Sequence, residues 1–190
     1  VTKVRILNTN SQKIVEATVQ TPGAQVSYAG NFELDGVPGK CAPIGLQFFD
    51  PTGTRTGRLL PTGAPQDLIL GMPVTCIDFA IPIVFIKASS LGKTGWESKQ
   101  ELDNDPVFLA RLEEVRAAGA RLMGLSDAPD LGIPKVAIIA PSRDGGTIAS
   151  RYFVSSNCHP VFAATGAMAL AAACHTPDTI AEALAEFNQN

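Results

Sequence analysis

The fold is decided by one stretch, Ala163-Ala164-Thr165-Gly166-Ala167-Met168-Ala169-Leu170-Ala171-Ala172-Ala173-Cys174. Its length allows about three helical turns, and its side chains are small and apolar on every side. A helix that is apolar all round belongs in the interior of a protein. Because the side chains are small, neighbouring elements must pack closely around it. The sequence therefore predicts a nearly fully buried central helix over residues 163–174.

Runs with a period of two residues precede this helix. Between Val4 and Phe49 apolar residues alternate with polar ones, and turns with Gly or Pro separate the runs, which predicts strands with one buried face. Residues 74–86 and 149–154 also favour strands, and Lys135–Ala140 is apolar enough for a central strand. Pro82 lacks a backbone N–H and predicts a bulge or an edge position. The predicted fold class is α/β in the α+β sense, a curved, mostly antiparallel sheet wrapped around the central helix.

A second helix is marked at both ends. Asp105 can cap it, Pro106 suits its first position and Gly124 follows its end, so it should run from Pro106 to about Met123. Its apolar stripe consists of Phe108, Leu112, Val115, Leu122 and Met123. A single apolar stripe is typical of a surface helix that covers a sheet.

The composition is that of a globular protein. The 190 residues are 45% hydrophobic and 17% charged, which fits a single domain over residues 1–190 with a real core. No apolar run is long enough to span a bilayer. The net charge is −3, and no run of Lys or Arg offers a footprint for a phosphate backbone. We expect neither a membrane nor a nucleic acid as a partner.

The cysteines indicate a reducing compartment. The chain contains Cys41, Cys76, Cys158 and Cys174 without a signal peptide at its start, which predicts free thiols and a cytoplasmic location. Two Cys-His pairs, at 158–159 and 174–175, lack a zinc-site spacing, since adjacent ligands on a strand point to opposite faces. No metal site is expected. The opening Val1-Thr2-Lys3 lacks a methionine and suggests a fragment of a longer chain.

A series of short sequence motifs, called words below, occurs in a characteristic order along the chain. The words are Asp35-Gly36-Val37-Pro38-Gly39, Thr56-Gly57-Arg58-Leu59-Leu60-Pro61-Thr62-Gly63, Cys76-Ile77-Asp78, Leu91-Gly92-Lys93-Thr94-Gly95, Pro134-Lys135-Val136-Ala137, and His159 followed by Thr165-Gly166-Ala167. Each word alone is common. The ordered series resembles the C-terminal domain of the PrpF-like family, which includes 2-methylaconitate isomerase, 4-oxalomesaconate tautomerase and methylitaconate isomerase.

The resemblance implies a diaminopimelate-epimerase-like fold, with two similar α/β domains and an active site in the cleft between them. This chain would be equivalent to the C-terminal half of such an isomerase, with the N-terminal domain absent. The implied reaction moves a proton along an allylic system of an unsaturated di- or tricarboxylate such as 2-methylaconitate, without a cofactor or metal. The family's first-domain Ser-Lys-Gly and Asn-Cys-Gly-Asn segments have no counterpart in these residues, so activity of the chain alone stays open.

The sequence departs from the related proteins at two positions. Ala163 lies two positions before the Thr-Gly-Ala word, where related amino-acid epimerases carry a catalytic cysteine, and this excludes a two-thiol racemase. Ile81 precedes Pro82, where the family commonly has Asn, and this removes one substrate contact that the resemblance implies.

The first site candidates lie where the central helix begins. Backbone N–H groups at Thr165, Gly166 and Ala167, with the positive end of the helix dipole, could bind a substrate carboxylate. Thr165 could equally be an N-cap, and Gly166 a close-packing residue. The resemblance adds substrate-binding candidates at Thr62, Gly63 and Lys135, and His159 as an acid, base or charge partner. Tight-turn formation, solvation and loop hydrogen bonding are their structural alternatives.

Two functions follow from these observations. The first is an isomerase in which this chain binds the carboxylates of a small polycarboxylate while the absent domain transfers the proton. The alternative is a non-catalytic, free-standing half that acts as a binding or homodimerisation module. On the first hypothesis a bulky residue at Gly166 would abolish binding, because it would block the approach of the backbone to the ligand.

Overall fold

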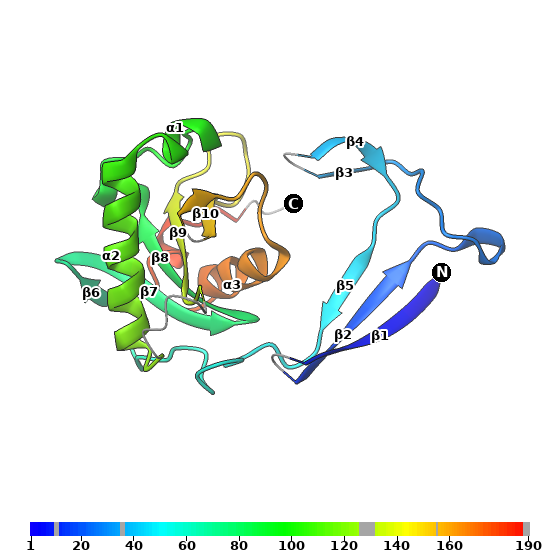
Figure 1. The fold of residues 1–190 in the computed structure, drawn as a ribbon, viewed down its shortest axis with the longest axis horizontal. Helices are drawn as coiled ribbons and strands as arrows, with labels where there is room; N and C mark the ends of the chain where they lie inside the picture. The colour runs from blue at the N-terminus through cyan, green and yellow to red at the C-terminus, as the bar shows by residue number, and fades with distance from the viewer. Residues whose placement is uncertain (10–11, 35–36, 126–131, 155, 188–190) are drawn as a thin grey trace. The chain divides into compact units, whose positions relative to one another are not determined.

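The computed structural model (Figure 1) describes residues 1–9, 12–34, 37–125, 132–154 and 156–187. Its contacts divide the chain into two units, unit 1 (Val1–Pro51) and unit 2 (Thr52–Asn190). Each unit has its own set of internal contacts and is described by itself. The single domain over residues 1–190 stays a prediction. The turn predicted at Asp35-Gly36 lies outside the described residues.

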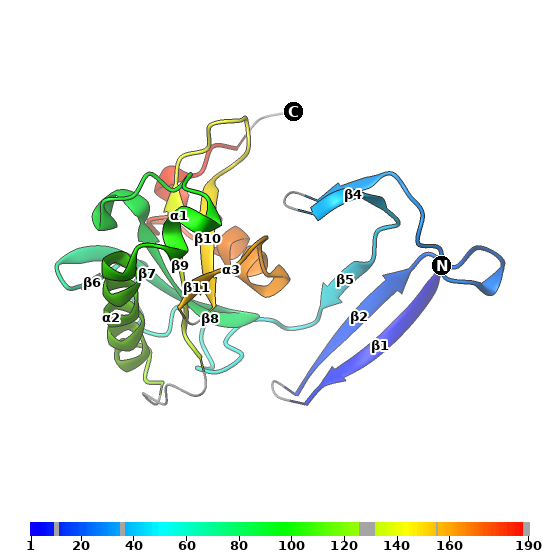
Figure 2. The same ribbon diagram turned by 45° about the horizontal axis from the view of Figure 1, so that its top comes forward.

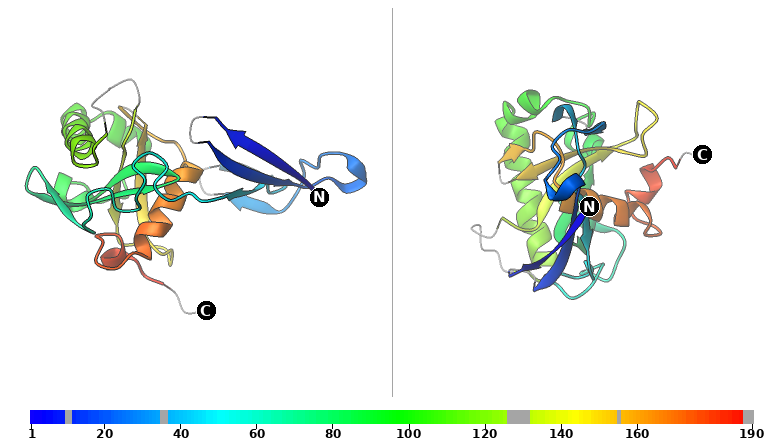
Figure 3. Two further views of the ribbon diagram at one scale, coloured as in Figure 1. Left: turned by 90° about the horizontal axis from the view of Figure 1, so that it is seen from below. Right: turned by 90° about the vertical axis from the view of Figure 1, so that its right-hand side faces the viewer.

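Unit 1 consists of strands and one short 3-10 turn at Pro22–Ala24 (Figure 3). An antiparallel sheet has the order β1-β2-β5, with β1 at Thr2–Asn8, β2 at Lys13–Val19 and β5 at Gly45–Phe48, and a hairpin joins β3 (Phe32–Leu34) to β4 (Val37–Cys41). The strands predicted from the alternation of apolar and polar residues are confirmed. The predicted burial of one face is wrong. Among the described hydrophobic side chains of unit 1, only Val15 and Ala17 are buried. No described helix of unit 1 covers this sheet.

Unit 2 is built on a six-stranded sheet of order β11-β10-β9-β8-β7-β6. The strands are β6 (Asp67–Ile69), β7 (Met72–Phe79), β8 (Ile81–Lys87), β9 (Lys135–Ala140), β10 (Ala149–Val154) and β11 (Asn157–Cys158). Neighbouring strands are antiparallel except β8 and β9, which are parallel. The mostly antiparallel sheet and the central place of β9 are therefore confirmed.

Helices cover both faces of this sheet (Figures 1 and 2). The helices are α1 (Lys99–Asp103), α2 (Pro106–Leu122) and α3 (Ala164–Cys174), with 3-10 turns at Ala88–Leu91 and Glu182–Leu184. Along β8, Val84 and Ile86 join the buried cluster under α2, whereas Ile83 and Phe85 join the cluster under α3. The alternation of side chains along a strand thus produces two separate cores, one on each face.

The ends of α2 agree with the sequence. Asp105 Oδ1 accepts a hydrogen bond from the Phe108 N–H at 2.9 Å, and Pro106 is the first helical residue. Gly124 follows the helix with φ of 68°, a left-handed conformation that glycine adopts at little cost. Leu122, predicted to belong to the apolar stripe, is instead 45% exposed.

The central helix is correctly located but less buried than predicted. Its buried residues are Gly166, Ala169, Leu170, Ala173 and Cys174. Ala164, Ala167 and Ala171 on the other side are exposed, so a nearly fully buried helix surrounded by strands is wrong for this chain. The sheet covers one face of α3 only, and an alanine face costs little to expose because each side chain is a single methyl group.

Pro82 lies in no bulge, but it takes the edge position that the sequence predicts, at the start of a strand that is otherwise internal. It lies opposite Asp78 of β7, and the pairing of β8 with β9 begins one residue later, at Ile83 and Lys135. At Pro82 the strand β8 therefore has one neighbour instead of two, so the missing N–H leaves no gap in the ladder with β9.

Candidate functional site

The start of α3 has no side-chain cap. Its N-cap residue is Ala163, which carries no hydrogen-bonding side chain, so the interpretation of Thr165 as the N-cap is wrong. The N–H of Ala167 donates to the carbonyl of Ala163 at 2.9 Å and is occupied within the helix. The N–H groups of Ala164, Thr165 and Gly166 precede that bond, and they are the donors that a carboxylate could use.

Gly166 also has a packing role. It is buried, and a Cβ at this position would lie 2.6 Å from Cε2 of Tyr152 and 3.3 Å from Cε1 of Phe162. The Tyr152 ring packs against Phe162 with centroids 5.5 Å apart, and burial raises the pKa of Tyr152 to about 12. A bulky residue at Gly166 would therefore collide with Tyr152 whether or not a ligand binds nearby.

His159 forms the turn that leads into α3. Its backbone N–H donates to the Tyr152 carbonyl at 2.7 Å, and its Nδ1 accepts from the Val161 N–H at 3.1 Å. With Nδ1 as an acceptor, the neutral ring carries its proton on Nε2. Burial raises the pKa of the neighbouring Cys158 thiol, which disfavours the thiolate that a nucleophile needs.

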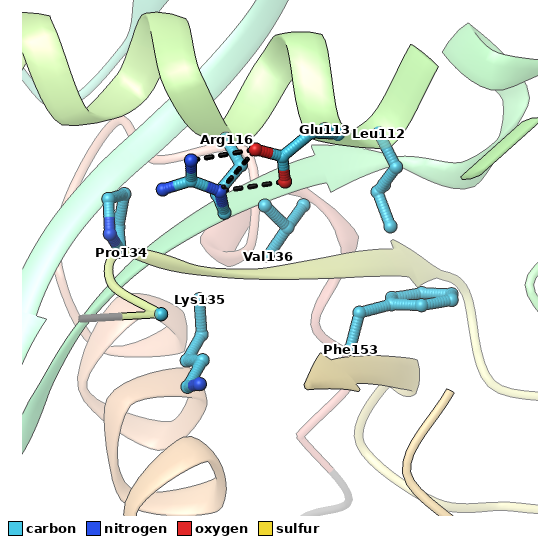
Figure 4. Close-up of a pocket in the computed structure, with 8 residues that line it drawn as sticks. Leu112, Glu113, Arg116, Pro134, Lys135, Val136 and Phe153 are labelled. Atoms are coloured by element: carbon cyan, nitrogen blue, oxygen red, sulfur yellow. Dashed lines mark hydrogen bonds and ion pairs between the residues drawn. The ribbon is translucent and has the colours of Figure 1, made fainter. Parts of the chain in front are cut away.

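Lys135 is a half-buried amine at the start of β9. The next residues, Val136 and Ala137, belong to the clusters under α2 and α3 respectively, so strand alternation puts Lys135 on the α3 face. Figure 4 shows its side chain on the opposite side of β9 from Arg116. It makes no hydrogen bond or ion pair with the residues that the structure describes. Burial lowers the pKa of Lys135, and the positive charge of Arg116 lowers it further.

The guanidinium group of Arg116 is engaged in hydrogen bonds within the protein. Its Nε and Nη2 donate to the Glu113 carboxylate at 2.7–2.9 Å, and its Nη1 donates to the Ile133 carbonyl at 3.2 Å. A depression beside it, lined also by Lys135 and Phe153 (Figure 4), has a volume of about 10 Å³. That is room for about one water molecule, and far too little for a di- or tricarboxylate.

The turn at Thr62 and Gly63 does not share a site with the start of α3. Thr62 Oγ1 donates to Asp67 Oδ2 at 2.8 Å, and Gly63 has φ of 81°. A little further along, Gln66 Nε2 donates to the carbonyl of Asp178 at 2.7 Å, beyond the C-terminal end of α3. An 11-residue helix is roughly 16 Å long, so the two predicted groups lie toward opposite ends of α3.

A buried carboxylate that the sequence did not single out organises a neighbouring loop. Asp78 is fully buried near the end of β7. Its carboxylate accepts four hydrogen bonds, from Thr54 Oγ1 at 2.7 Å, Arg55 N at 2.8 Å, Thr56 N at 2.8 Å and Thr56 Oγ1 at 2.9 Å. These bonds fix a loop with two exposed arginines, Arg55 and Arg58. The signal in the sequence was a carboxylate in a strand with no other charged residue.

This loop and Lys135 lie at the same end of the sheet. Lys135 is opposite Ile83, and Ile83 is opposite Ile77, the residue next to Asp78. Two strand spacings separate β9 from β7, so the backbones at Lys135 and Asp78 are roughly 10 Å apart. Strand alternation puts the Asp78 carboxylate on the α2 face and the Lys135 side chain on the α3 face, so the two groups lie at the same end of the sheet but on opposite faces.

The described residues contain no set of three His, Cys, Asp or Glu side chains placed to bind a metal ion. No helix within the described ranges is both long and apolar enough to cross a bilayer. The four cysteines are free thiols, with Cys41 exposed and the other three buried.

Known proteins resemble the whole of this chain. YbhH of Escherichia coli K12 is 46% identical over 180 residues, which cover 95% of this chain and 51% of YbhH. The 4-oxalomesaconate tautomerase of Pseudomonas putida KT2440 is 39% identical over 184 residues, or 97% of this chain and 51% of that protein. The chain thus spans about half the length of the curated relatives it matches.

The fold matches a solved structure as well. The crystal structure of methylitaconate-delta-isomerase superposes with a TM-score of 0.85 at 26% identity, covering 100% of this chain and 55% of that chain. An exposed side of α3 is therefore compatible with this fold. The family model described as PrpF protein matches residues 1–190, so the chain belongs to the PrpF family.

Proposed function

We propose that this chain is half of an isomerase that moves a proton along the allylic system of an unsaturated di- or tricarboxylate. The observation that carries the proposal is membership of the PrpF family over residues 1–190, together with relatives named as a tautomerase of 4-oxalomesaconate and an isomerase of methylitaconate. On this proposal the chain corresponds to the C-terminal half of a two-domain, diaminopimelate-epimerase-like protein that uses no cofactor. Its own contribution is to bind the substrate's carboxylates.

Lys135 is the group best suited to that contribution. Lys135 has no acidic partner among the residues that the structure describes, and burial lowers its pKa, so its ammonium gains more from a carboxylate than a fully solvated lysine does. The uncapped start of α3 supplies a second kind of anion-binding group, the N–H groups of Thr165 and Gly166. Arg55 and Arg58 are further exposed cations in the loop that Asp78 fixes, and arginine binds carboxylates in a bidentate manner.

The proton-transfer groups belong, on this proposal, to the half of the relatives that this chain does not match. Proton transfer between carbons requires a positioned acid or base. Cys158 is poorly suited, since burial raises the pKa of its thiol. His159 stays a candidate through Nε2, although its Nδ1 is engaged with the Val161 N–H.

The alternative function is a non-catalytic binding or homodimerisation module. The observation that favours it is the exposed apolar surface of unit 1, where Val4, Ile6 and Leu46 are 44–50% exposed. On this alternative the chain self-associates and shows no preference for unsaturated polycarboxylates.

Calorimetric titration of the chain with 4-oxalomesaconate tests the proposal. We expect weak binding, and an affinity about tenfold lower for Lys135→Met, because a charge-assisted hydrogen bond contributes about 1.5 kcal/mol or more. Lys87→Met is the matched control, since Lys87 is a partly buried lysine at the other end of the parallel pair β8–β9. It should leave the affinity unchanged.

The outcome that counts against the proposal is equal affinity for the wild type and Lys135→Met. Lys135→Met should also keep or raise the free energy of unfolding, since it removes a half-buried charge that has no partner among the described residues. A large loss of stability would mean that Lys135 has a structural role, and its assignment to substrate binding would be withdrawn.

A further inference from the structure

Tyr152 of β10 is a buried side chain whose hydroxyl has no partner within the described part of the chain. The residue is 2% exposed, and its ring packs against those of Phe162 and His159. Among the described residues, Trp96 Nε1 is the only fully enclosed side-chain donor or acceptor without a hydrogen bond, so the Tyr152 hydroxyl reaches solvent. A buried tyrosine usually bonds its hydroxyl to the protein. Tyr152 instead presents an unpaired donor at the end of a buried ring.

This ring lies beside the first turn of α3. Its Cε2 and Cδ2 atoms are 2.6 Å and 2.8 Å from the position that a Cβ would take at Gly166, the third residue of the helix. The hydroxyl oxygen is bonded to the ring carbon next to Cε2, so it belongs to the same part of the ring. The first N–H groups of a helix have no acceptor within it. The phenol and these N–H groups are therefore neighbouring donors.

Lys135 lies on the same face of the sheet as Tyr152. In the antiparallel pair β9–β10, Tyr152 is opposite Ala137, two residues along β9 from Lys135. Tyr152 and Ala137 both belong to the buried cluster under α3, so strand alternation puts Lys135 on that face as well. Diagonal neighbours of this kind are roughly 7–8 Å apart, a separation that a long side chain can span. Three donor groups thus gather near the start of α3.

We infer that the Tyr152 hydroxyl donates a hydrogen bond to a carboxylate of the substrate, beside the contacts proposed for Lys135 and the start of α3. The inference deepens the proposed function, on which it rests for the nature of the ligand. An ionised carboxylate has two oxygens and about four lone-pair sites, so it can accept from a phenol, an ammonium and a backbone N–H at once. The ligand supplies the acceptor that the described residues do not.

The protonation of Tyr152 suits a donor and excludes a base. Burial raises the pKa of Tyr152 to about 12, so the hydroxyl keeps its proton at neutral pH. A neutral phenol donates to a carboxylate without bringing a charge that must itself be desolvated. Tyr152 is therefore a binding residue, and the proton transfer between carbons is left to other groups.

Calorimetric titration of Tyr152→Phe with 4-oxalomesaconate tests the inference. Phenylalanine keeps the ring and removes only the hydroxyl, so the affinity should fall about tenfold relative to the wild type, as for the loss of a hydrogen bond to a charged group. The urea midpoint should stay unchanged, because the hydroxyl bonds no described residue of the free chain. Tyr28→Phe is the matched control. Tyr28 is the only other tyrosine and is 83% exposed in unit 1, so its substitution should leave the affinity unchanged.

NMR observes the contact directly in the wild-type chain. Isotope labelling of tyrosine Cζ gives one signal from Tyr152 and one from Tyr28, and the two variants assign them. Addition of 4-oxalomesaconate should shift the Tyr152 signal and leave the Tyr28 signal in place. An unshifted Tyr152 signal with bound ligand, or equal affinities of the wild type and Tyr152→Phe, would overturn the inference, since the hydroxyl would then contact water only. A lowered urea midpoint for Tyr152→Phe would indicate a structural role and would also count against it.

Tricarballylate, a saturated tricarboxylate without an allylic system, separates this inference from the proposed function. If the chain binds tricarballylate with the same dependence on Tyr152 but does not bind 4-oxalomesaconate, the proposed substrate is wrong and the carboxylate contact is upheld. If the chain binds 4-oxalomesaconate with no dependence on Tyr152, the inference fails and the proposed function stands. Binding of neither acid to the wild-type chain would overturn both.

Discussion

At Gly166 the backbone of α3 approaches the Tyr152 ring more closely than any side chain would allow, with 2.6 Å between a Cβ and Cε2. We predict that Gly166→Ala lowers the free energy of unfolding by about 1–3 kcal/mol, which is typical of overpacking a core. This loss should exceed the gain in helix propensity of about 1 kcal/mol that alanine brings. Urea denaturation of the two proteins measures the difference.

A double-mutant cycle isolates the cause. In a Tyr152→Val background the Gly166→Ala substitution should be neutral or stabilising, since the ring that it would meet is gone. If Gly166→Ala costs the same with and without the ring, the contact with Tyr152 is not what requires glycine. Stabilisation by Gly166→Ala in the wild type would also contradict the prediction.

Asp78 is predicted to hold its loop through the four hydrogen bonds that it accepts. Asp78→Ala should cost about 3–5 kcal/mol, because it leaves several partly buried donors without acceptors. Asp78→Asn is the matched control and should cost about 1–2 kcal/mol, since its oxygen can still accept from the Arg55 and Thr56 N–H groups. Thermal or urea unfolding gives both values, and equal costs would contradict this role.

At the scale of elements, α2 was predicted accurately because its signals are local. Asp105, Pro106 and Gly124 act within one turn of their own positions, and each does in the structure what its chemistry predicts. The bounds of α3 were predicted to within one residue for the same kind of reason. Its burial was not, because burial depends on what packs around a helix, and periodicity describes only the helix itself.

The candidate site was predicted less well than the elements. Thr62 and Thr165 were both named as substrate-binding candidates, but the sequence does not reveal at which end of α3 a loop lies. The face of the sheet to which the Lys135 side chain points follows from strand alternation, once β9 is known to be central. The partners of Asp78 could not be predicted, because they come from a loop 22–24 residues away along the chain.

The stability that Asp105 contributes at the start of α2 depends on pH. The hydrogen bond from Lys93 Nζ, with that from the Phe108 N–H, holds the pKa of Asp105 below its usual value of 3.8. A carboxylate whose folded pKa is depressed adds stability that is fully present above the unfolded pKa and lost as pH falls through the folded pKa. We predict that the wild type is more stable than Asp105→Asn at neutral pH, and that this difference shrinks below pH 3.8.

Urea midpoints measured across this range check the prediction. Asn caps a helix about as well as Asp, so Asp105→Asn removes the charge but keeps the cap. Asp144→Asn, at an exposed carboxylate with no ion pair among the described residues, is the control and should not change the acid dependence. A difference between wild type and Asp105→Asn that stays constant down to about pH 2 would contradict the role of Lys93.

At the scale of the whole molecule, the two units differ in how complete they are. Unit 2 has a sheet covered by α2 and α3 and two buried clusters. Unit 1 has an amphipathic sheet in which Val15 and Ala17 are buried, whereas Val4, Ile6 and Leu46 are 44–50% exposed. This difference agrees with the proposal that the chain works together with the half of the family protein that it does not match.

Turnover of 4-oxalomesaconate tests this account most directly. The measurement compares the 190-residue chain with a folded chimera in which it replaces the matched half of the Pseudomonas tautomerase. A positioned acid or base contributes on the order of 10²–10⁴ in rate, so the chimera should be at least about 100-fold faster than the chain alone. Comparable turnover by the chain alone, with purity established, would contradict the account and direct attention to His159 and Cys158.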